Sequence, residues 1–226
     1  MRVLSNDPET PTTRRIRLAI DGAGFYYRAG QAAALAAGDL VPTPYSIASA
    51  PYETAREGWL EFLVKVDGSS RFGAVVDTLE SGTTIRVEGP AGSFVLPDAA
   101  MAAPLLFIAG GTGVAPMRSM ILAALHAGHR GTRALVYSAR SPREFAYVDE
   151  FRRLADEGHL ALTLTLTGEM EEWAHARGRT GAEHLAELLA PDTLAFVCGP
   201  PAMVADLPAA LVSLGLPRDR VRTDDW

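Results

Sequence analysis

The sequence predicts a two-domain protein: an N-terminal antiparallel Greek-key β-barrel over residues 1–100 and a C-terminal α/β domain with a parallel sheet over residues 101–226. The 226 residues are enough for two compact domains of about 100 residues each. Short strand-like segments recur about every ten residues in the first part, which is typical of a small barrel. Apolar strands alternate with helix-like segments in the second part, which is typical of a parallel sheet covered by helices.

Turn signals separate the expected elements of the first domain. The segment 83–88 (TTIRVE) alternates apolar and polar residues and stops at Gly89-Pro90, and the apolar run 59–66 ends at Asp67-Gly68. One short helix is expected at 74–80, because Gly82 follows as a terminator. Strands are expected at 12–20, 25–35, 59–66, 83–88 and 93–96.

The second domain begins where the pattern changes, near residues 99–104. The run PLLFIA is uniformly apolar, as in a strand that is buried on both faces. Strands are expected at 104–109, 134–137, 160–167 and 193–198 and near Val221, and helices at 115–127, 145–157, 182–189 and 202–214. Pro208 is expected to kink the last helix, and the segment 168–181 is expected to be an exposed loop.

Composition excludes several classes of protein. The formal charge of −6 argues against nucleic-acid binding. The single cysteine, Cys198, excludes an intrachain disulfide and a four-cysteine cluster, and the histidines show no ligand spacing, so no metal site is expected. No apolar run approaches the ~18–20 residues of a membrane helix, and the N-terminus lacks a signal-peptide core. A soluble cytoplasmic protein is expected, with a monomer as the default.

A glycine-rich turn, GGTGVAP at 110–116, follows the strand 104–109 and precedes a helix. Glycines let backbone amides approach a ligand, and a helix start offers unpaired N–H groups and a partial positive charge. This arrangement suits a pyrophosphate, although the spacing differs from the G-x-G-x-x-G dinucleotide fingerprint. The alternative is a turn whose glycines are needed only for packing.

A second turn, CGPPAM at 198–203, ends another apolar strand. Ligands of open parallel sheets bind beyond the carboxyl ends of the strands, so the two turns are expected at one edge, where they would share a ligand. Taken alone, a cysteine such as Cys198 is more often a small buried apolar residue.

A third motif, TPYSIASAP at 43–51, lies in the first domain. Tyr45 offers a flat face, Ser46 a hydroxyl and the following strand its backbone amides, which together suit a flat heteroaromatic ring. The alternative is a strand bounded by prolines.

Along the chain, four motifs follow one another: TPYSIASAP at 43–51, GPAGSF at 89–94, GGTGVAP at 110–116 and CGPPAM at 198–203. This order resembles the ferredoxin–NADP⁺ reductase superfamily, which includes flavin reductases and oxygenase reductase components. The resemblance covers the chain from about residue 12 to the C-terminus. It implies a flavin-binding barrel followed by an NAD(P)-binding α/β domain. It also implies FAD, with FMN less favoured, as the cofactor and NADPH or NADH as the cosubstrate.

The resemblance assigns roles near the reacting rings. In the superfamily, the tyrosine matching Tyr45 lies against the isoalloxazine ring and the serine matching Ser46 hydrogen-bonds flavin N5. Cys198 would lie beside the nicotinamide. The C-terminus matches an acid, Asp224, followed after one residue by an aromatic, Trp226, that stacks on the flavin and would move aside for the nicotinamide. The alternative is a polar tail with an unrelated tryptophan.

The resemblance implies further flavin contacts, with two departures from the usual pattern. An arginine usually stands at the position of Thr43 and a serine or threonine at that of Gly73, and a lost charged hydrogen bond costs roughly 1.5–3 kcal/mol. Arg71 is expected to replace the missing guanidinium; the alternative is a weakly held flavin that acts as a released substrate. The implied flavin contacts are Thr43, Pro44, Tyr45, Ser46, Ile47, Val64, Lys65, Val66, Arg71, Gly73, Ala74, Val75 and Trp226.

The nucleotide contacts are implied in the same way. The strand 134–137 leads into SARS at 138–141, where the superfamily reads the adenosine ribose, and arginine and hydroxyl donors there favour the 2′-phosphate of NADPH. The alternative is a solvated loop arginine at 140. Tyr147 is expected to cover the adenine. The implied contacts are Gly111, Thr112, Gly113, Pro116, Ser138, Arg140, Ser141, Tyr147, Arg179, Cys198, Gly199, Pro200 and Met203.

The implied function is an NAD(P)H-dependent flavoprotein reductase. Hydride would pass from NAD(P)H to flavin N5, and electrons would then pass to a protein acceptor, either a ferredoxin or an oxygenase component. The acidic composition disfavours an acidic ferredoxin as that acceptor. Three alternatives remain open: reduction of free flavin, a non-catalytic electron-transfer subunit of a larger complex, and a scaffold that has lost its flavin.

Overall fold

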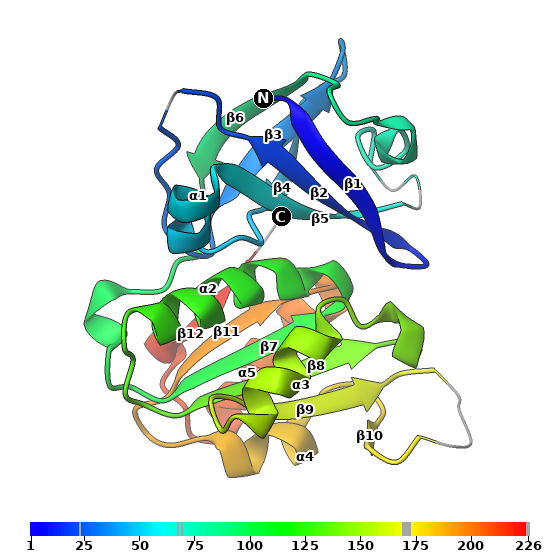
Figure 1. Cartoon of the computed structure of the whole chain (residues 1–226). Coiled ribbons are helices and arrows are strands. Elements are labelled where there is room, and N and C mark those ends of the chain that lie inside the picture. Colours follow the sequence, from blue (N-terminus) through cyan, green and yellow to red (C-terminus); the bar gives the residue numbers. More distant parts are fainter. Residues whose placement is uncertain (23, 67, 69, 169–172, 225–226) are drawn as a thin grey trace.

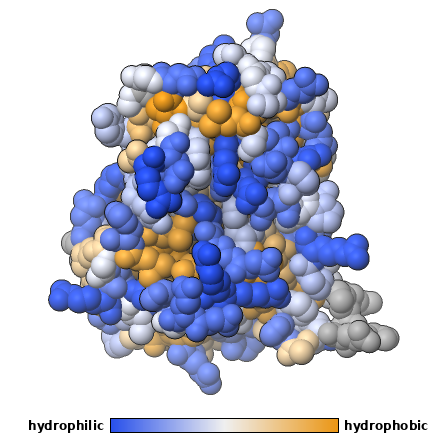
Figure 2. Space-filling view, viewed as in Figure 1, coloured by the Kyte–Doolittle hydropathy of each residue, from blue (hydrophilic) through white to orange (hydrophobic). Residues whose placement is uncertain are grey.

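A computed structural model describes the chain except for residues 23, 67, 69, 169–172 and 225–226. Figure 1 shows two bodies of secondary structure, one formed by the first part of the chain (blue to cyan) and one by the rest (green to red). Helix α2 (Val114–His126) lies on the side of the second body that faces the first. Figure 2 shows that hydrophilic side chains cover most of this face, with apolar atoms exposed in separate patches.

Among the residues that the structure describes, six antiparallel strands build the first domain as two three-stranded sheets. In spatial order, the first sheet contains β1 (Val3–Thr10), β2 (Thr13–Ala19) and β5 (Trp59–Lys65), and the second contains β4 (Thr43–Ser46), β3 (Ala32–Ala37) and β6 (Ile85–Ala91). The bridges Arg2–Thr84 and Ile47–Phe62 join the two sheets. The side chains between them form an apolar core that includes Phe62 and Phe72. The predicted antiparallel β-domain is confirmed.

In the described part of the second domain, six parallel strands form the sheet. Their spatial order is β10 (Ala176–Arg177), β9 (Ala161–Leu166), β8 (Arg133–Ala139), β7 (Leu105–Gly110), β11 (Leu194–Cys198) and β12 (Val221–Thr223). The chain moves outward from β7 through β8, β9 and β10, and then returns to β11 on the other side of β7. Ligands of such sheets bind where the strand order reverses, which here is the edge shared by β7 and β11.

Helices accompany this sheet, so the predicted α/β class is confirmed. They are α2, α3 (Val148–Asp156), α4 (Ala182–Leu185) and α5 (Pro201–Ser213), and α5 continues through Pro208. No helix among the described residues is long and apolar enough to cross a membrane. Strand β6 ends at Ala91 and β7 begins at Leu105, and we propose that the domain boundary lies between them near residue 100, as the sequence predicts.

Several expectations for the first domain are wrong. The segment 93–96 is not a strand, and the expected helix 74–80 is reduced to a 3-10 turn, Val76–Thr78. Strand β1 and helix α1 (Pro51–Glu57) were not expected. Polar residues and Pro8 conceal β1 in the sequence, and an edge strand tolerates proline because one side of it makes no ladder bonds.

The second domain differs from expectation mainly at the ends of its elements. Helix α3 begins three residues late, because Tyr147 adopts a left-handed backbone (φ 56°) that cannot continue a helix. The expected loop 168–181 contains β10. The expected helix 182–189 consists of the short α4 followed by a 3-10 turn, Ala186–Leu188.

Candidate functional site

The two glycine turns meet at the edge where β7 and β11 end. After β7, the turn Gly111–Gly113 leads directly into α2. A side chain on Gly113 would place its Cβ 2.3 Å from the carbonyl oxygen of Cys198, so only glycine lets the turns approach this closely. Gly111 has φ +55° and no atom within 4 Å of its Cβ position. The Cβ side of Gly111 therefore faces open space beside the helix start.

The second turn packs tightly on the first. A Cβ on Gly110 would lie 2.7 Å from the ring of Pro200, and a Cβ on Gly199 would lie 2.8 Å from the sulfur of Met203. Pro116 is buried in the first turn of α2. Packing thus accounts for Gly110, Gly113 and Gly199, whereas the open position of Gly111 is not explained by packing.

Three of the four predicted catalytic residues lie together, and they come from both domains. The hydroxyl of Ser46, at the end of β4, donates to Oδ2 of Asp224 at 3.3 Å. The thiol of Cys198, at the end of β11, donates to the same oxygen at 3.5 Å. The Asp224 amide bonds the carbonyl of Val197 at 3.0 Å, which fixes the carboxylate just beyond β12.

The cluster keeps the Cys198 thiol protonated. Burial is the largest cause that raises the pKa of Cys198 well above its ordinary value, and the charge of Asp224 and the hydrogen bond to it raise the pKa further. Asp224 itself is only 6% exposed. At neutral pH, Cys198 is therefore a neutral hydrogen-bond donor and not a thiolate nucleophile.

Tyr45 is half-buried beside the 3-10 turn of the first domain. Its hydroxyl pairs with the hydroxyl of Ser70, and its ring centroid lies 5.7 Å from that of Phe72. Ser70 also accepts a bond from the Gly73 amide at 2.8 Å. A Cβ on Gly73 would lie 2.5 Å from the Lys65 carbonyl oxygen, so a serine or threonine does not fit there.

Ser70 is a functional candidate that sequence reasoning missed. Its place three residues before the bonded amide of Gly73 is typical of a residue that caps a helical turn, and that spacing was the available signal. The Ser70 hydroxyl links Tyr45 to this turn. Ser70 therefore supplies the polar group that Gly73 lacks.

The other predicted flavin contacts differ in exposure. Ile47 and Val64 are buried in the core, so only their backbone groups are available to a ligand. Thr43, Val66 and Val75 are half-buried, whereas Pro44, Lys65, Arg71 and Ala74 are exposed. Trp226 lies outside the described residues. Among the described residues, no group of His, Cys, Asp or Glu is placed to hold a metal ion.

The predicted nucleotide contacts follow β8 and β11. Ser138 is buried and pairs with Gly110 across the sheet, and Arg140 is exposed just beyond the end of β8. Half-buried positions are Thr112, Ser141, Gly199 and Met203, and exposed ones are Pro200 and Arg179. Sequence reasoning missed Tyr137, whose hydroxyl donates to the Gly111 carbonyl at 3.1 Å and so fixes the open turn.

The structure buries Tyr147, the residue that is expected to cover the adenine. Its side chain is 6% exposed, and its ring lies 5.0 Å from the guanidinium carbon of Arg118. Its amide donates to Glu9 of the first domain at 2.7 Å. A ring that is buried between the domains offers no face to an adenine, and no sequence pattern indicated its left-handed backbone.

The described residues fit a flavin and a dinucleotide. The half-buried ring of Tyr45 and the donors of Ser46 and Cys198 lie on the two sides of the domain interface. The turn at Gly111, with open space at its Cβ position, stands at the start of α2, and helix starts offer unpaired N–H groups that bind phosphate.

Two family models match the two domains. Residues 2–96 match the oxidoreductase FAD-binding domain, and residues 107–208 match the oxidoreductase NAD-binding domain. The order of the two matches is the order that the sequence resemblance implies.

Named relatives match the chain over most of its length. The chain is 33% identical to ferredoxin–NADP reductase B of Sorangium cellulosum (strain So ce56) in an alignment of 239 positions that covers all of this chain and 96% of that protein. It is 31% identical to the reductase component 2 of terephthalate 1,2-dioxygenase of Comamonas sp., covering 95% of this chain and 64% of that protein.

Solved structures share the whole fold. The Amycolatopsis cytochrome P450 reductase GcoB superposes with a TM-score of 0.85 at 25% identity, over 99% of this chain and 68% of that one. A Neisseria gonorrhoeae ferredoxin NADP⁺ reductase with bound FAD and NADP gives a TM-score of 0.85 at 21% identity, over 99% and 96% of the two chains. The chain therefore belongs to the ferredoxin–NADP reductase-like family of oxidoreductases, in which an FAD-binding domain precedes an NAD-binding domain.

Proposed function

We propose that this protein is an NAD(P)H-dependent reductase that holds FAD as a fixed cofactor and passes electrons to a protein acceptor. The observation that carries the proposal is the cluster of Ser46, Cys198 and Asp224, which joins the FAD-binding domain to the NAD-binding domain through one carboxylate. A scaffold that only joined two domains would not need hydrogen-bond donors from both of them at the edge where dinucleotides bind.

Each residue has a defined task in this proposal. Flavin, when bound, accepts a hydride from the nicotinamide and passes the electrons onward. Ser46 would offer its hydroxyl to a bound flavin ring and Cys198 would border the nicotinamide with an uncharged thiol, while Asp224 accepts bonds from both. Tyr45 would supply a ring face to the flavin, and the amides of the turn at Gly111 would hold the pyrophosphate.

The acceptor that we propose is a ferredoxin or an oxygenase component. Two relatives carry these words in their names, the ferredoxin–NADP reductase of Sorangium cellulosum and the dioxygenase reductase component of Comamonas sp.. Free flavin as a released substrate is the second candidate. It is favoured because Thr43 stands where the family usually has the arginine that pairs with the flavin phosphate, and Gly73 stands where the family usually has a hydroxyl.

The visible spectrum of the purified protein tests the proposal. A blue-region flavin absorption band that stays with the protein through gel filtration, and that NADPH bleaches in the absence of oxygen, is the expected result. A colourless protein that oxidises NADPH only when flavin is added would instead support the released-substrate function. A colourless protein that stays inactive with added flavin would refute both.

Replacing Arg71 by alanine is expected to weaken flavin binding about tenfold to a hundredfold, the loss that goes with one charge-assisted hydrogen bond. Arg71 is exposed and adjoins Ser70 at the turn beside Tyr45. Flavin fluorescence titration measures the affinity, and Arg86→Ala, at an exposed arginine on β6, is the matched control. Equal affinities of Arg71→Ala and the unchanged protein would remove Arg71 from the site.

Replacing Arg140 by alanine is expected to raise KM for NADPH about tenfold and to leave KM for NADH nearly unchanged, because only NADPH carries a 2′-phosphate. Arg140 is exposed beyond the end of β8, beside the Gly110–Ser138 pair. Steady-state rates with both cosubstrates check this. A protein that already prefers NADH before the change would contradict the assignment.

A further inference from the structure

Helix α2 contacts the cluster at one end and the first domain one turn later. Its preceding residue, Gly113, lies against the Cys198 carbonyl. Arg118 donates to the carbonyl of Ala48 at 2.9 Å, and Ser119 donates to the carbonyl of Ser49 at 2.7 Å. These two carbonyls follow Ser46 by only two and three residues. A rigid helix segment of about 7–8 Å, at 1.5 Å per residue, thus connects the two sides of the cluster.

Arg118 is enclosed by carboxylates from three elements. Its guanidinium bonds Glu53 of α1 at 2.9 and 3.1 Å and Glu150 of α3 at 2.6 and 3.0 Å, and it lies 3.8 Å from Glu61 of β5. The residue is 6% exposed. Burial alone would lower the pKa of Arg118, but the glutamates raise it above its ordinary value, so the charge is retained. The paired bonds fix the guanidinium in one orientation.

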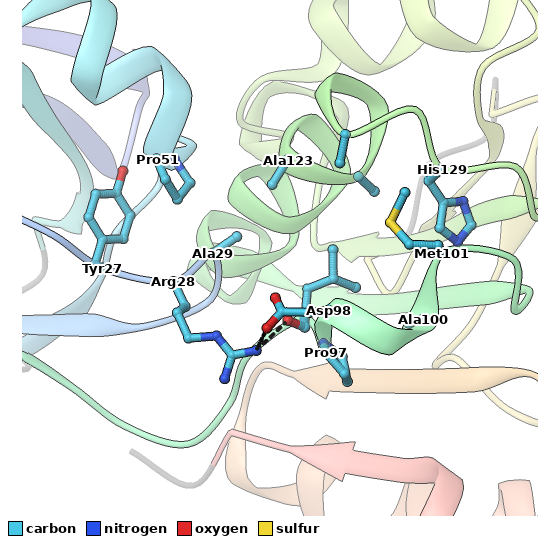
Figure 3. A pocket seen from close by; sticks show the side chains of 13 residues that line it. Tyr27, Arg28, Ala29, Pro51, Pro97, Asp98, Ala100, Met101, Ala123 and His129 are labelled. Atoms are coloured by element: carbon cyan, nitrogen blue, oxygen red, sulfur yellow. Dashed lines mark hydrogen bonds and ion pairs between the residues drawn. The ribbon is translucent and has the colours of Figure 1, made fainter.

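At the other end of α2 the domain interface contains a cavity as well as the stacked rings of Tyr52 and His126, whose centroids are 4.0 Å apart. A cavity of about 270 Å³ lies between the first domain, the connecting segment 96–101 and the C-terminal part of α2. Figure 3 shows Tyr27, Pro51 and Ala123 on its wall and the ion pair between Arg28 and Asp98 across it. That pair, at 3.3 Å, is exposed to solvent and contributes little to alignment.

We propose that Arg118 is a positioning residue that, with Ser119, sets the distance between Ser46 and the Cys198–Asp224 pair. Arg118 bonds Ala48 and Glu53 of the first domain, while Glu150 of its own domain holds the guanidinium in place, so these directional bonds set the alignment of the domains beside the cluster. The far end of α2 meets the first domain through the stacked rings of Tyr52 and His126 and not through charged bonds of this kind. The role in the reaction rests on the proposed reductase function. A displacement of about 1 Å between reacting groups slows a reaction about a hundredfold, so the effect falls on the rate more than on binding.

The kinetic test compares Arg118→Met, which removes the charge, with Arg118→Lys, which keeps it, and with Ser119→Ala. Arg28→Ala, at the exposed pair beside the cavity, is the matched control. Stopped-flow measurement at saturating NADPH gives the rate of flavin reduction per bound flavin. Arg118→Met is expected to lower this rate about 10- to 100-fold, with NADP⁺ and flavin affinities within about threefold. Arg118→Lys is expected to reduce flavin at a rate between those of Arg118→Met and the unchanged protein. The control Arg28→Ala is expected to keep the full rate of the unchanged protein.

Hydrogen exchange provides a readout that does not depend on catalysis. The Tyr147 amide, which donates to Glu9 across the interface, is expected to exchange faster in Arg118→Met while amides of β7 keep their protection. An unchanged rate per bound flavin, or unchanged exchange at Tyr147, overturns the proposal. If Arg118→Met does not fold, a wild-type rate in Arg118→Lys overturns it. If the natural protein reduces no flavin, the proposed function fails, and the exchange result still decides whether Arg118 aligns the domains.

Discussion

Replacing Ser46 by alanine is expected to slow the reduction of bound flavin by NADPH about 10- to 100-fold, with flavin affinity within about threefold. The Ser46 hydroxyl is the donor that the first domain contributes to the cluster, and its 3.3 Å bond to Asp224 is long enough to be exchanged for a bond to the flavin ring. A bond that strengthens only during hydride transfer lowers the barrier without changing ground-state binding. Stopped-flow absorbance at several NADPH concentrations separates the two effects.

Two controls define this result. Ser46→Thr keeps a hydroxyl at the same place on β4 and is expected to retain much of the rate. Ser213→Ala removes a hydroxyl that bonds only within α5, so the rate is expected to stay at its natural value. If Ser46→Ala instead weakens flavin binding and keeps the reduction rate, Ser46 is a binding residue and has no part in the transfer.

Replacing Gly113 by alanine is expected to lower the free energy of unfolding by about 3 kcal/mol, the upper part of the usual range for overpacking. The new Cβ would lie 2.3 Å from the Cys198 carbonyl oxygen and 2.5 Å from its carbon, and both belong to backbone at the end of β11. Backbone in a buried strand cannot yield as a flexible side chain does. Urea unfolding monitored by circular dichroism measures the loss.

Gly111→Ala is the matched control, because it lies in the same turn. Its Cβ meets no atom within 4 Å, so the remaining cost is the left-handed backbone, about 1 kcal/mol. Gly111→Ala is expected to weaken NADP⁺ binding, whereas Gly113→Ala mainly loses stability. Equal stability losses in the two variants would show that close packing of the turns is not what requires glycine at 113.

Local patterns were sufficient for most of the second domain, because a strand that is buried on both faces leaves an uninterrupted apolar run. The runs that became β7 and β11 are of this kind. The first domain was harder to predict, since polar residues conceal the edge strand β1. Helix α1 carried a signal that was overlooked: Pro51 begins it, and Glu53 accepts a bond from the Ala50 amide, as in a helix start.

The site depended on the family resemblance more than on local patterns. Ser46 and Asp224 are separated by 178 residues, and no periodicity relates such distant positions. The enclosure of Arg118 was not predicted either, because its three glutamates stand on separate elements. The burial of Tyr147 was not predicted for a related reason: burial at a domain interface is decided by how whole domains meet.

The protonated state of Cys198 has a consequence for chemical durability. Peroxides attack thiolates and react slowly with thiols, so the raised pKa of this single cysteine slows its conversion to sulfenic acid. The same carboxylate that orients the sulfur thus suppresses its oxidation.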